Sequence, residues 1–389
     1  MLRKVVPLTI LILSLGYYGF SRLPYSQEHT SPPTSTNNNM VGDTNQKPEG
    51  IPGLTTPDGF VISYYARDVS GARSMTKNTD GNIIYVGTRD SSLYGVVDLN
   101  KDGISEKTVT ISSSLDTPNG VVYKDGDLYV AEVSRILRFK DIDNNFDQNP
   151  SYEVIYDQLP KDKHHGWKYI AFGPDGRLYI PIGAPCNVCE DRGIYSRIVT
   201  LNVETNVVNT FATGIRNTVG FDWSPIDNTL YFTDNGRDLL GDDLPPDELN
   251  HAPSTGLDFG FPRCHGNTTQ DPQFGTTDSC QTHTKPVVEL GPHVAALGMK
   301  FYRGDMFPAE YKNQILIAEH GSWNRRDPIG YKVSLVNPVT GSYTDLVTGW
   351  LVAGESWGRP VDILELPDGS VLISDDLNNA IYRLAYHLE

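Results

Sequence analysis

The sequence is short of positive charge. It holds 32 Lys and Arg against 48 Asp and Glu, which gives a formal net charge of −16 at pH 7. A field of this sign repels nucleic acid phosphates and anionic membrane surfaces. We therefore expect no nucleic acid partner, and an anionic cofactor would bind only where positive charge gathers locally.

Long apolar runs are also scarce. One covers residues 5–20 behind Arg3 and Lys4, too short for a comfortable membrane span. We expect residues 1–23 to be a signal peptide or, alternatively, a membrane anchor, the only membrane attachment that the sequence suggests. Residues 24–50 have the Ser, Thr, Asn and Pro content of a solvated, disordered linker. The folded domain would then be residues 51–389, exported to the periplasm or the cell exterior.

Cysteine is rare as well, with four residues in the chain. Cys186 and Cys189 form a Cys-x-x-Cys pair, while Cys264 and Cys280 lie far apart in sequence. An even number in an exported protein favours two disulfides. A Cys-x-x-Cys pair can also be a redox motif or half of a zinc site, although a zinc ribbon would show a second closely spaced pair.

No long segment shows the 3.6-residue apolar period of a helix, whereas one β pattern recurs from Asp58 to the C-terminus. Each repeat has an apolar run, a tight turn and a second apolar run, followed by another strand. The turns are Asp80-Gly81, Asp125-Gly126, Asp175-Gly176, Asp227-Asn228, Lys312-Asn313 and Asp368-Gly369. Six tandem copies predict an all-β, six-bladed β-propeller with four-stranded antiparallel blades. A β-sandwich would not explain the repetition.

The ends of the repeated region predict how the ring closes. The last repeat, residues 360–386, supplies three strands, and the segment FVISYYA from Phe60 has no repeat of its own. We expect it to close the last blade as an N-terminal strand. Residues 238–292 are the only long departure from the repeat.

Polar residues gather on one face of this predicted ring. Because every hairpin turn lies on one face, residues before each first strand and after each second strand share the opposite face, around the central channel. The first group is Arg73, Asn119, His165, Arg216 with Asn217, His293 and Arg359. The second group is Arg89, Glu132, Asp234, Asn235, Glu319, His320, Asp375 and Asp376. Such residues can simply bridge blades, but converging arginines suit a planar or polycarboxylate anion.

Two of these positions suggest chemistry. His165 can take a proton from a hydroxyl at neutral pH, as a general base does. The turn Asp234-Asn235-Gly236-Arg237 offers backbone carbonyls to a hard cation such as calcium.

Five segments carry a family resemblance that extends from about Asp58 to Tyr386. They are HHGWKYIAFGPDGRLYIPIG from His164, GIRN from Gly214, DNG at Asp234, HGSWNRRDPIGYKV from His320 and GRPVDILELPDG from Gly358. Together they resemble the soluble sugar dehydrogenases that depend on pyrroloquinoline quinone (PQQ), and most closely the sorbosone and pyranose dehydrogenase branch.

The resemblance implies roles for individual residues. His165 would be the base that removes the sugar hydroxyl proton, with His164 as the neighbouring alternative. Arg216 and Asn217 would contact the quinone carbonyls, and Arg359 the carboxylates of PQQ. The carbonyls of Gly236 and Arg237 would bind calcium together with PQQ. Arg73 and His320 lie at channel positions consistent with cofactor contact. Hydride would pass to the quinone from the carbon that bears this sugar hydroxyl. Arg216 and calcium would polarise the quinone carbonyl that accepts it.

The chain departs from the glucose dehydrogenases of this family at three positions. Ala184 replaces an aspartate that orients the base, His320 replaces a cofactor-binding lysine, and Val361 replaces a second arginine. These changes match the sorbosone-like branch, so the resemblance implies a sugar or a sugar-derived aldehyde as substrate rather than necessarily glucose. Asp247 and Glu248 resemble a region that carries structural calcium in relatives, although a solvated acidic loop is the alternative.

Two other classes of function remain open from the residues. A non-enzymatic propeller would bind carbohydrate or protein on the same face and would have no affinity for PQQ. A calcium-dependent hydrolase or lactonase would use axial carboxylates as metal ligands, which Arg216 and Arg359 would crowd. If the chain is a dehydrogenase, it also needs an external electron acceptor, such as a cytochrome or a quinone.

Overall fold

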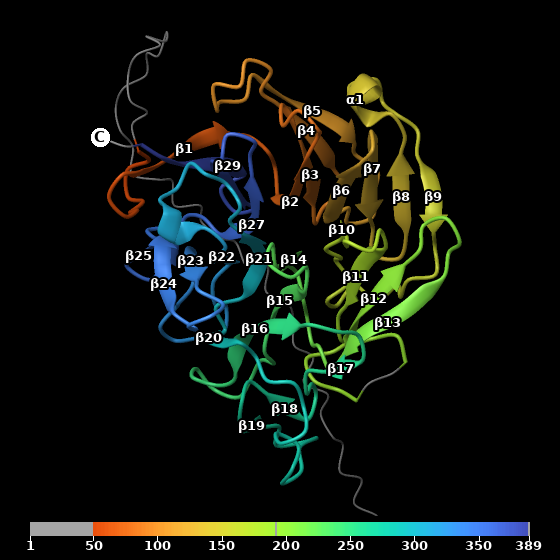
Figure 1. Ribbon diagram of the computed structural model, residues 1–389, viewed down its shortest axis with the longest axis vertical. Helices are drawn as coiled ribbons and strands as arrows, with labels where there is room; N and C mark the ends of the chain where they lie inside the picture. Colours follow the sequence, from red (N-terminus) through yellow and green to blue (C-terminus); the bar gives the residue numbers. More distant parts are fainter. Residues whose placement is uncertain (1–49, 191–192, 388–389) are drawn as a thin grey trace, which may run out of the picture.

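The predicted hairpins form the inner half of six β-sheets arranged in a ring. The computed structural model describes residues 50–190 and 193–387, so the expected signal segment and all but the last residue of the expected linker lie outside the described residues. The innermost strands gather near the centre of Figure 1: β2 (Ala72–Lys77), β6 (Gly120–Lys124), β10 (Ala171–Phe172), β14 (Phe221–Trp223), β21 (Ala296–Phe301) and β27 (Pro360–Glu365). In the described part of the chain, no helix is long and apolar enough to cross a membrane.

The remaining strands of each blade follow outward in antiparallel order. The second strands are β3 (Ile83–Thr88), β7 (Asp127–Ala131), β11 (Leu178–Ile182), β15 (Leu230–Asp234), β22 (Ile315–Glu319) and β28 (Val371–Asp375). The third strands are β4 (Leu93–Val97), β8 (Ile136–Phe139), β12 (Arg197–Leu201), β16 (Pro246–Ala252), β23 (Lys332–Val336) and β29 (Ala380–Tyr386). The outer strands are β5 (Lys107–Ser112), β9 (Glu153–Tyr156), β13 (Val208–Thr213), β20 (Val288–Pro292), β24 (Tyr343–Val347) and β1 (Phe60–Ala66). The predicted six-bladed β-propeller is therefore confirmed.

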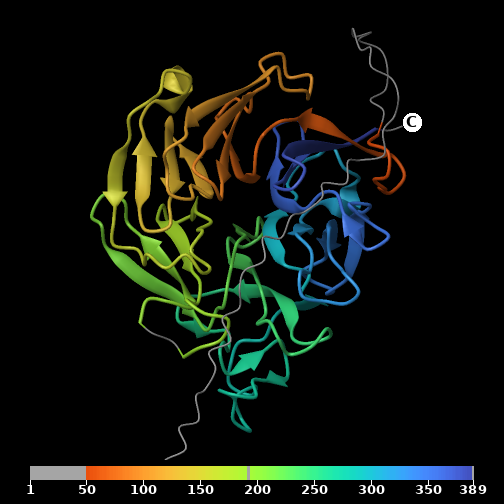
Figure 2. The same cartoon turned by 180° about the vertical axis from the view of Figure 1, so that it is seen from behind.

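The N-terminal strand closes the ring as expected. β1 pairs antiparallel with β29, from Phe60 opposite Tyr386 to Ala66 opposite Ile381. The two strands lie side by side in both views, β1 in red-orange and β29 in dark blue (Figure 1 and Figure 2). The sixth blade is therefore built from both ends of the described chain.

Two details of the blades differ from expectation. The third blade gains a fifth strand, because β17 (Leu257–Asp258) pairs parallel with β13. The segment 238–292 also contains β16 and β20, the outer half of the fourth blade, so only residues 253–287 leave the repeat. β16 was not predicted from the sequence because several of its buried residues are polar. They are Asp247, Glu248 and Asn250, so the strand lacks a regular alternation of apolar and polar residues.

Short elements complete the described fold. They are α1 (Ile142–Asn145), the 3-10 turn η1 (Ala309–Tyr311), and the hairpins β18 (Cys264–His265) with β19 (Thr269–Gln270) and β25 (Leu351–Val352) with β26 (Glu355–Ser356). Disulfides join Cys186 to Cys189 and Cys264 to Cys280, which confirms two disulfides. The first lies between β11 and β12, on the face opposite the inner hairpin turns; we call this the site face.

The apolar core lies between neighbouring blades. One cluster joins Ile83 and Tyr85 of the first blade to Val121, Leu128 and Leu137 of the second. Because each sheet buries its faces against its neighbours, no blade has a core of its own. This mutual packing fixes the loops on the site face relative to one another.

Candidate functional site

Acidic residues at the ends of second strands hold the site segments in place. Asp234 accepts hydrogen bonds from the backbone N–H groups of Arg216 (2.8 Å) and Asn217 (2.6 Å). Asp375 accepts one from the backbone N–H of Arg359 (2.9 Å). These carboxylates therefore stabilise the backbone from which the site arginines project.

Strand alternation separates these acids from the residues that face the axis. Glu132 accepts from the backbone N–H of Asp116 and pairs with Arg135, and Glu319 accepts from the Tyr343 hydroxyl on the outer strand β24. The sequence grouping placed both glutamates around the channel, and that grouping was wrong. Successive side chains in a strand point to opposite sides of the sheet. Where two polar residues are adjacent at the end of a strand, only one of the two therefore faces the axis.

Arg73, His320 and Arg359 meet around one carboxylate. Asp376 binds Arg73 Nη1 (2.5 Å) and His320 Nε2 (2.8 Å), while Arg359 Nη2 lies 2.8 Å from His320 Nδ1. Since a guanidinium only donates, Nδ1 accepts and Nε2–H donates to Asp376, so this imidazole is neutral. Burial, followed by the charge of Arg359, lowers the pKa of His320 to about 3. Arg73 Nε also donates to Asn119 Oδ1 (2.7 Å), which joins the first two blades.

A third guanidinium lies beside this group. Arg89 stacks over the Trp167 ring at 3.8 Å, and the residue as a whole is exposed. The contact with the protein strips part of the water from its guanidinium, and this partial desolvation, followed by the charge of Arg73, lowers its pKa to about 10. With the imidazole neutral, three guanidinium groups and the carboxylate of Asp376 sum to a charge of +2. That excess, in a chain of net charge −16, marks this part of the site face for an anion.

His165 is held with one ring nitrogen in use and one available. Its Nδ1 lies 2.9 Å from the backbone carbonyl oxygen of Ala184, so Nδ1 carries the hydrogen and Nε2 keeps its lone pair. Burial, followed by the charge of Arg216, lowers the pKa of His165 well below its usual range. The ring is therefore neutral at pH 7 and able to accept a proton. The centroid of the His164 ring lies 4.1 Å from that of His165, with the two rings tilted by 50°, and His164 is itself exposed.

Arg216 is buried, and four hydrogen bonds hold its guanidinium in place. Its guanidinium donates to the carbonyl of Asn235 (3.1 Å), to Asp238 Oδ2 (3.0 Å), and to both the backbone carbonyl and the side-chain carbonyl of Asn187 (2.8 and 2.9 Å). Asp238 accepts in addition from Asn324 Nδ2 (3.0 Å), on the loop that follows β22. Three loops of the site face are thus tied to one guanidinium.

The DNG turn leaves two backbone carbonyls unclaimed. The carbonyls of Asn235 and Asp238 accept hydrogen bonds, yet within residues 50–190 and 193–387 no donor reaches those of Gly236 and Arg237. The Arg237 side chain turns away to Asp271 (2.6 Å). These are the two oxygens that the sequence predicts for calcium, a cation that takes carbonyl ligands readily.

The buried acids near this turn are used by the backbone. Asp247 accepts from the N–H groups of Gly236 (2.8 Å) and Ala296 (3.3 Å), and Glu248 from that of Gly266 (2.5 Å). Burial raises the pKa of Asp247 to about 6 and also raises that of Glu248. Among the described residues, no group of three or more His, Cys, Asp or Glu side chains is placed to hold a metal ion. The expected second calcium site therefore stays a prediction.

Trp167 connects the two halves of the site. It packs with Val219, Leu297 and Val361, one from each of the next three blades, in a small apolar cluster. The His165 ring lies edge-on to Trp167 at 6.4 Å, and Arg89 covers the indole. His165, Arg216 and the arginine group are therefore neighbours rather than scattered residues.

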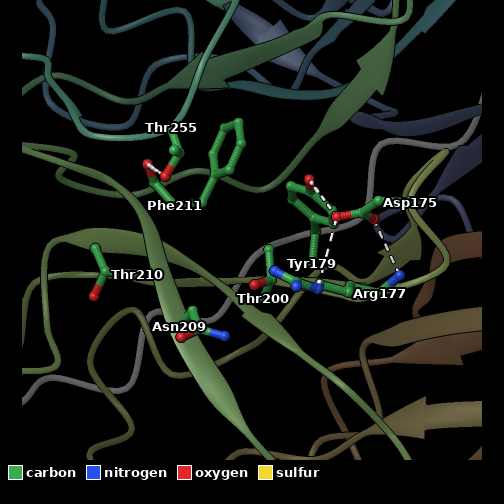
Figure 3. Close-up of a pocket in the computed structure, with 8 residues that line it drawn as sticks. All are labelled: Asp175, Arg177, Tyr179, Thr200, Asn209, Thr210, Phe211 and Thr255. Carbon is green, nitrogen blue, oxygen red and sulfur yellow. Dashed lines mark hydrogen bonds and ion pairs between the residues drawn. The ribbon is translucent and has the colours of Figure 1, made fainter.

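A hollow in the surface lies elsewhere on the molecule. This cavity has a volume of about 290 Å³. Figure 3 shows the residues that line it, which are Asp175 of the β10–β11 hairpin turn, Arg177, Tyr179, Thr200, Asn209, Thr210, Phe211 and Thr255. A smaller one of about 150 Å³ adjoins it and shares Asp175, Tyr179 and Phe211. Neither contains a predicted site residue. Both lie toward the hairpin face, so they do not belong to the candidate site.

Sequence reasoning missed Asn187 and Asp238. The Cys-x-x-Cys spacing drew attention only to the cysteines, and Asn187 lies between them. Asp238 was taken as the first residue of the departure from the repeat. His293 and Asn119, both named as channel residues, serve as supports: His293 Nε2 meets the Gly241 carbonyl (2.9 Å), and Asn119 Nδ2 donates to the Lys168 carbonyl (2.8 Å).

Comparison with known sequences gives matches over most of the chain and matches over a short segment of it. The family model described as "Domain of unknown function (DUF7133)" matches residues 75–384. An uncharacterized protein of Borreliella burgdorferi is 36% identical over 353 residues, which cover 86% of this chain and 91% of that protein. A PQQ-dependent pyranose dehydrogenase of Coprinopsis cinerea is 43% identical over 70 residues, 18% of this chain and 9% of that protein.

Solved structures share the propeller. The holo PQQ domain of the pyranose dehydrogenase from Coprinopsis cinerea superposes with a TM-score of 0.74 at 17% identity, over 87% of this chain and 98% of that one. A calcium structure of a Trichoderma reesei carbohydrate-active enzyme of family AA12 gives 0.74 at 16% identity, over 88% and 99%. At such identities the likeness establishes the fold.

Proposed function

Because the chain belongs to the family described as "Domain of unknown function (DUF7133)", we propose its function from the site itself: PQQ-dependent oxidation of a sugar or sugar-derived aldehyde. One observation carries the proposal. A neutral histidine with an available Nε2 lies beside three guanidinium groups, one of which is paired with the carboxylate of Asp376. The short match to a PQQ-dependent pyranose dehydrogenase and the structures of PQQ enzymes with this fold support it.

The donor groups suit a polycarboxylate quinone. The charge of +2 around Asp376 would compensate an anion, with Arg73, Arg359 and His320 as binding residues and Arg89 added to those predicted from sequence. Arg216 and Asn217 would face the quinone carbonyls. Guanidinium groups bind carboxylates with paired, charge-assisted hydrogen bonds, which a neutral ligand would not require.

His165 would act as the general base. Its Nδ1–H donates to the Ala184 carbonyl, so Nε2 accepts the proton of the substrate hydroxyl. The backbone carbonyl thereby does for this chain what an aspartate at that position does in glucose dehydrogenases. Bound PQQ would supply the electron sink that accepts hydride from the carbon bearing this hydroxyl. Arg216 stays protonated and presents positive charge where negative charge develops.

Calcium would bind at the DNG turn. The unclaimed carbonyls of Gly236 and Arg237 provide two oxygens, and the cofactor would provide others. Two neutral ligands make a weak site by themselves, so we expect calcium and PQQ to bind together. Its charge would add to that of Arg216.

The remaining proposals concern context. Two disulfides favour an oxidising compartment, which supports export. An external electron acceptor would be needed after each turnover. The sorbosone-like or pyranose-like character of the substrate rests on Ala184, His320 and Val361.

Reconstitution tests the proposal. Purified protein is mixed with PQQ and CaCl₂, and dye reduction is followed with a panel of sugars and aldehydes. We expect turnover that His165→Ala lowers by about 10²–10⁴-fold while PQQ still binds. His251→Ala, a half-buried histidine near the hairpin face, is the matched control and should leave turnover intact. Absence of any PQQ binding by the wild type would instead favour a non-enzymatic propeller.

A further inference from the structure

A four-residue disulfide loop reaches into the candidate site. The Cys186–Cys189 bond holds the two Cα atoms 6.2 Å apart, with Asn187 between them. Asn187 Oδ1 accepts from Arg216 Nη2 (2.9 Å) and from the backbone N–H of Asp238 (2.8 Å). Its Nδ2 donates to the Asp238 carbonyl (3.0 Å), and its own carbonyl accepts from Arg216 Nε (2.8 Å). Every polar group of this side chain is therefore in use.

These contacts decide where Arg216 can lie. The residue is only 4% exposed, and two of its four hydrogen bonds end on Asn187. A buried donor that loses its partner pays the cost of desolvation without compensation. Removing the Asn187 amide would also take two hydrogen bonds from the Asp238 backbone, while Arg216 and Asn324 still bind the Asp238 carboxylate. The guanidinium would then lose one hydrogen bond directly, and the backbone that carries a second acceptor would be restrained less.

The disulfide restrains the loop that presents Asn187. The loop carries the backbone carbonyl that binds Arg216 Nε, so its conformation sets the direction of that bond. Without the sulfur–sulfur bond, residues 186–189 would be held by these hydrogen bonds alone.

We propose that Asn187 is a positioning residue for Arg216, and that the Cys186–Cys189 disulfide makes this positioning depend on the oxidation state of the pair. The oxidised loop holds Arg216 in place. Reduction breaks the sulfur–sulfur bond, yields two thiols and frees the loop: an external dithiol supplies two electrons and two protons and becomes a disulfide, whereas a phosphine supplies two electrons, takes its oxygen from water and leaves the two protons of that water on the thiols. The claim about Arg216 stands on the contacts, whereas its consequence for PQQ rests on the proposed function.

The first test needs no cofactor. Hydrogen exchange of the Arg216 Nε–H group is followed by ¹⁵N NMR in the cofactor-free protein, with the signal assigned through Arg216→Lys. We expect at least about tenfold faster exchange in Asn187→Ala, as for loss of a hydrogen bond to a charged group. Reduction by a phosphine should accelerate exchange in the wild type and have no further effect in Cys186→Ser/Cys189→Ser.

Asn202→Ala is the matched control. Asn202 lies in the same blade at the β12–β13 turn, where its side chain accepts from the backbone of Glu204 and Thr205. Its loss should leave Arg216 exchange unchanged. Equal exchange in Asn187→Ala and the wild type would overturn the positioning role. Faster exchange in Asn187→Ala with no effect of reduction would overturn the redox dependence alone.

The second test concerns the cofactor and avoids reductants, which react with quinones. The PQQ dissociation constant is measured by quenching of tryptophan fluorescence in the presence of calcium. Asn187→Ala and Cys186→Ser/Cys189→Ser should each weaken binding about tenfold, and Asn202→Ala should not. If the wild type binds no PQQ, the proposed function fails, while the exchange measurement still decides the role of Asn187. If PQQ binds equally to all variants, Arg216 position does not affect the cofactor.

Discussion

Gly183 leaves the space that His165 occupies, and filling that space should impair catalysis more than folding. A Cβ atom built on Gly183 would lie 2.6 Å from His165 Cβ, 3.1 Å from the His165 carbonyl oxygen and 3.3 Å from that of Arg216. The φ angle of Gly183 is outside the left-handed range, so alanine adds bulk without backbone strain. Gly183→Ala therefore acts by contact alone.

The size of the effect follows from the overlap. Ordinary contacts begin at 3.4 Å, so His165 must move by at least about 0.8 Å. A misplacement near 1 Å costs on the order of 100-fold in rate, because the base leaves its reach of the hydroxyl proton. Overpacking of this kind destabilises by about 1–3 kcal/mol. We expect kcat to fall about 100-fold with a melting temperature only a few degrees lower.

The assay compares Gly183→Ala with Gly95→Ala. A Cβ on Gly95 would lie 3.0 Å from Cδ2 of Phe146, in the core between the first and second blades. This variant should lose similar stability and keep its kcat. Wild-type kcat in Gly183→Ala, at the expected stability, would refute the assignment of His165 as a base held by this contact.

Three further outcomes are expected. Asp376→Asn removes the carboxylate shared by Arg73 and His320. Because Arg73 is almost fully buried, we expect the free energy of unfolding, measured with urea, to fall by about 3–5 kcal/mol. A fall of less than about 1 kcal/mol would show that the pair is not buried in solution. Burial disfavours the imidazolium form of His320, so in the cofactor-free protein its ring should stay neutral from pH 8 down to about pH 4. Half-protonation should fall near pH 3 instead of the usual 6.5. Protonation near pH 6, observed by ¹⁵N NMR, would contradict the hydrogen-bond assignment. Calcium should raise the melting temperature clearly only when PQQ is present, since the DNG turn offers two carbonyls; an equal shift without PQQ, measured by differential scanning fluorimetry, would indicate a complete protein site.

The repeat was readable from the sequence because its turns are chemically explicit. Asp125-Gly126 and Asp175-Gly176 can hardly serve except as tight turns, and the apolar runs around them alternate. β16 was not predicted because several of its buried residues are polar. The hydrogen bonds that they accept from backbone N–H groups cannot be inferred from composition. Strand register has the same limitation: a shift of one residue decides whether Glu319 or His320 faces the axis.

The site could be predicted where side chains carry the chemistry and not where the backbone does. Arg216 and His165 stand out as residue types at a channel position. The absence of an aspartate at Ala184 suggested a different orientation of the base, but only coordinates show the backbone carbonyl in that role. Asn187 is one of many asparagines in the chain, and only its place in a disulfide loop distinguishes it.

The pairing of β1 with β29 has a consequence for biosynthesis. The sixth blade needs β1, which is made before the other five blades, and three strands made after them, so five blades can be complete while the ring is still open. Until residues 380–386 have left the ribosome, β1 has no partner and the sixth-blade surface that packs on the first blade is missing. The nascent chain must therefore wait for its final strand before it reaches the native state, and loss of that strand would affect the first blade as much as the last.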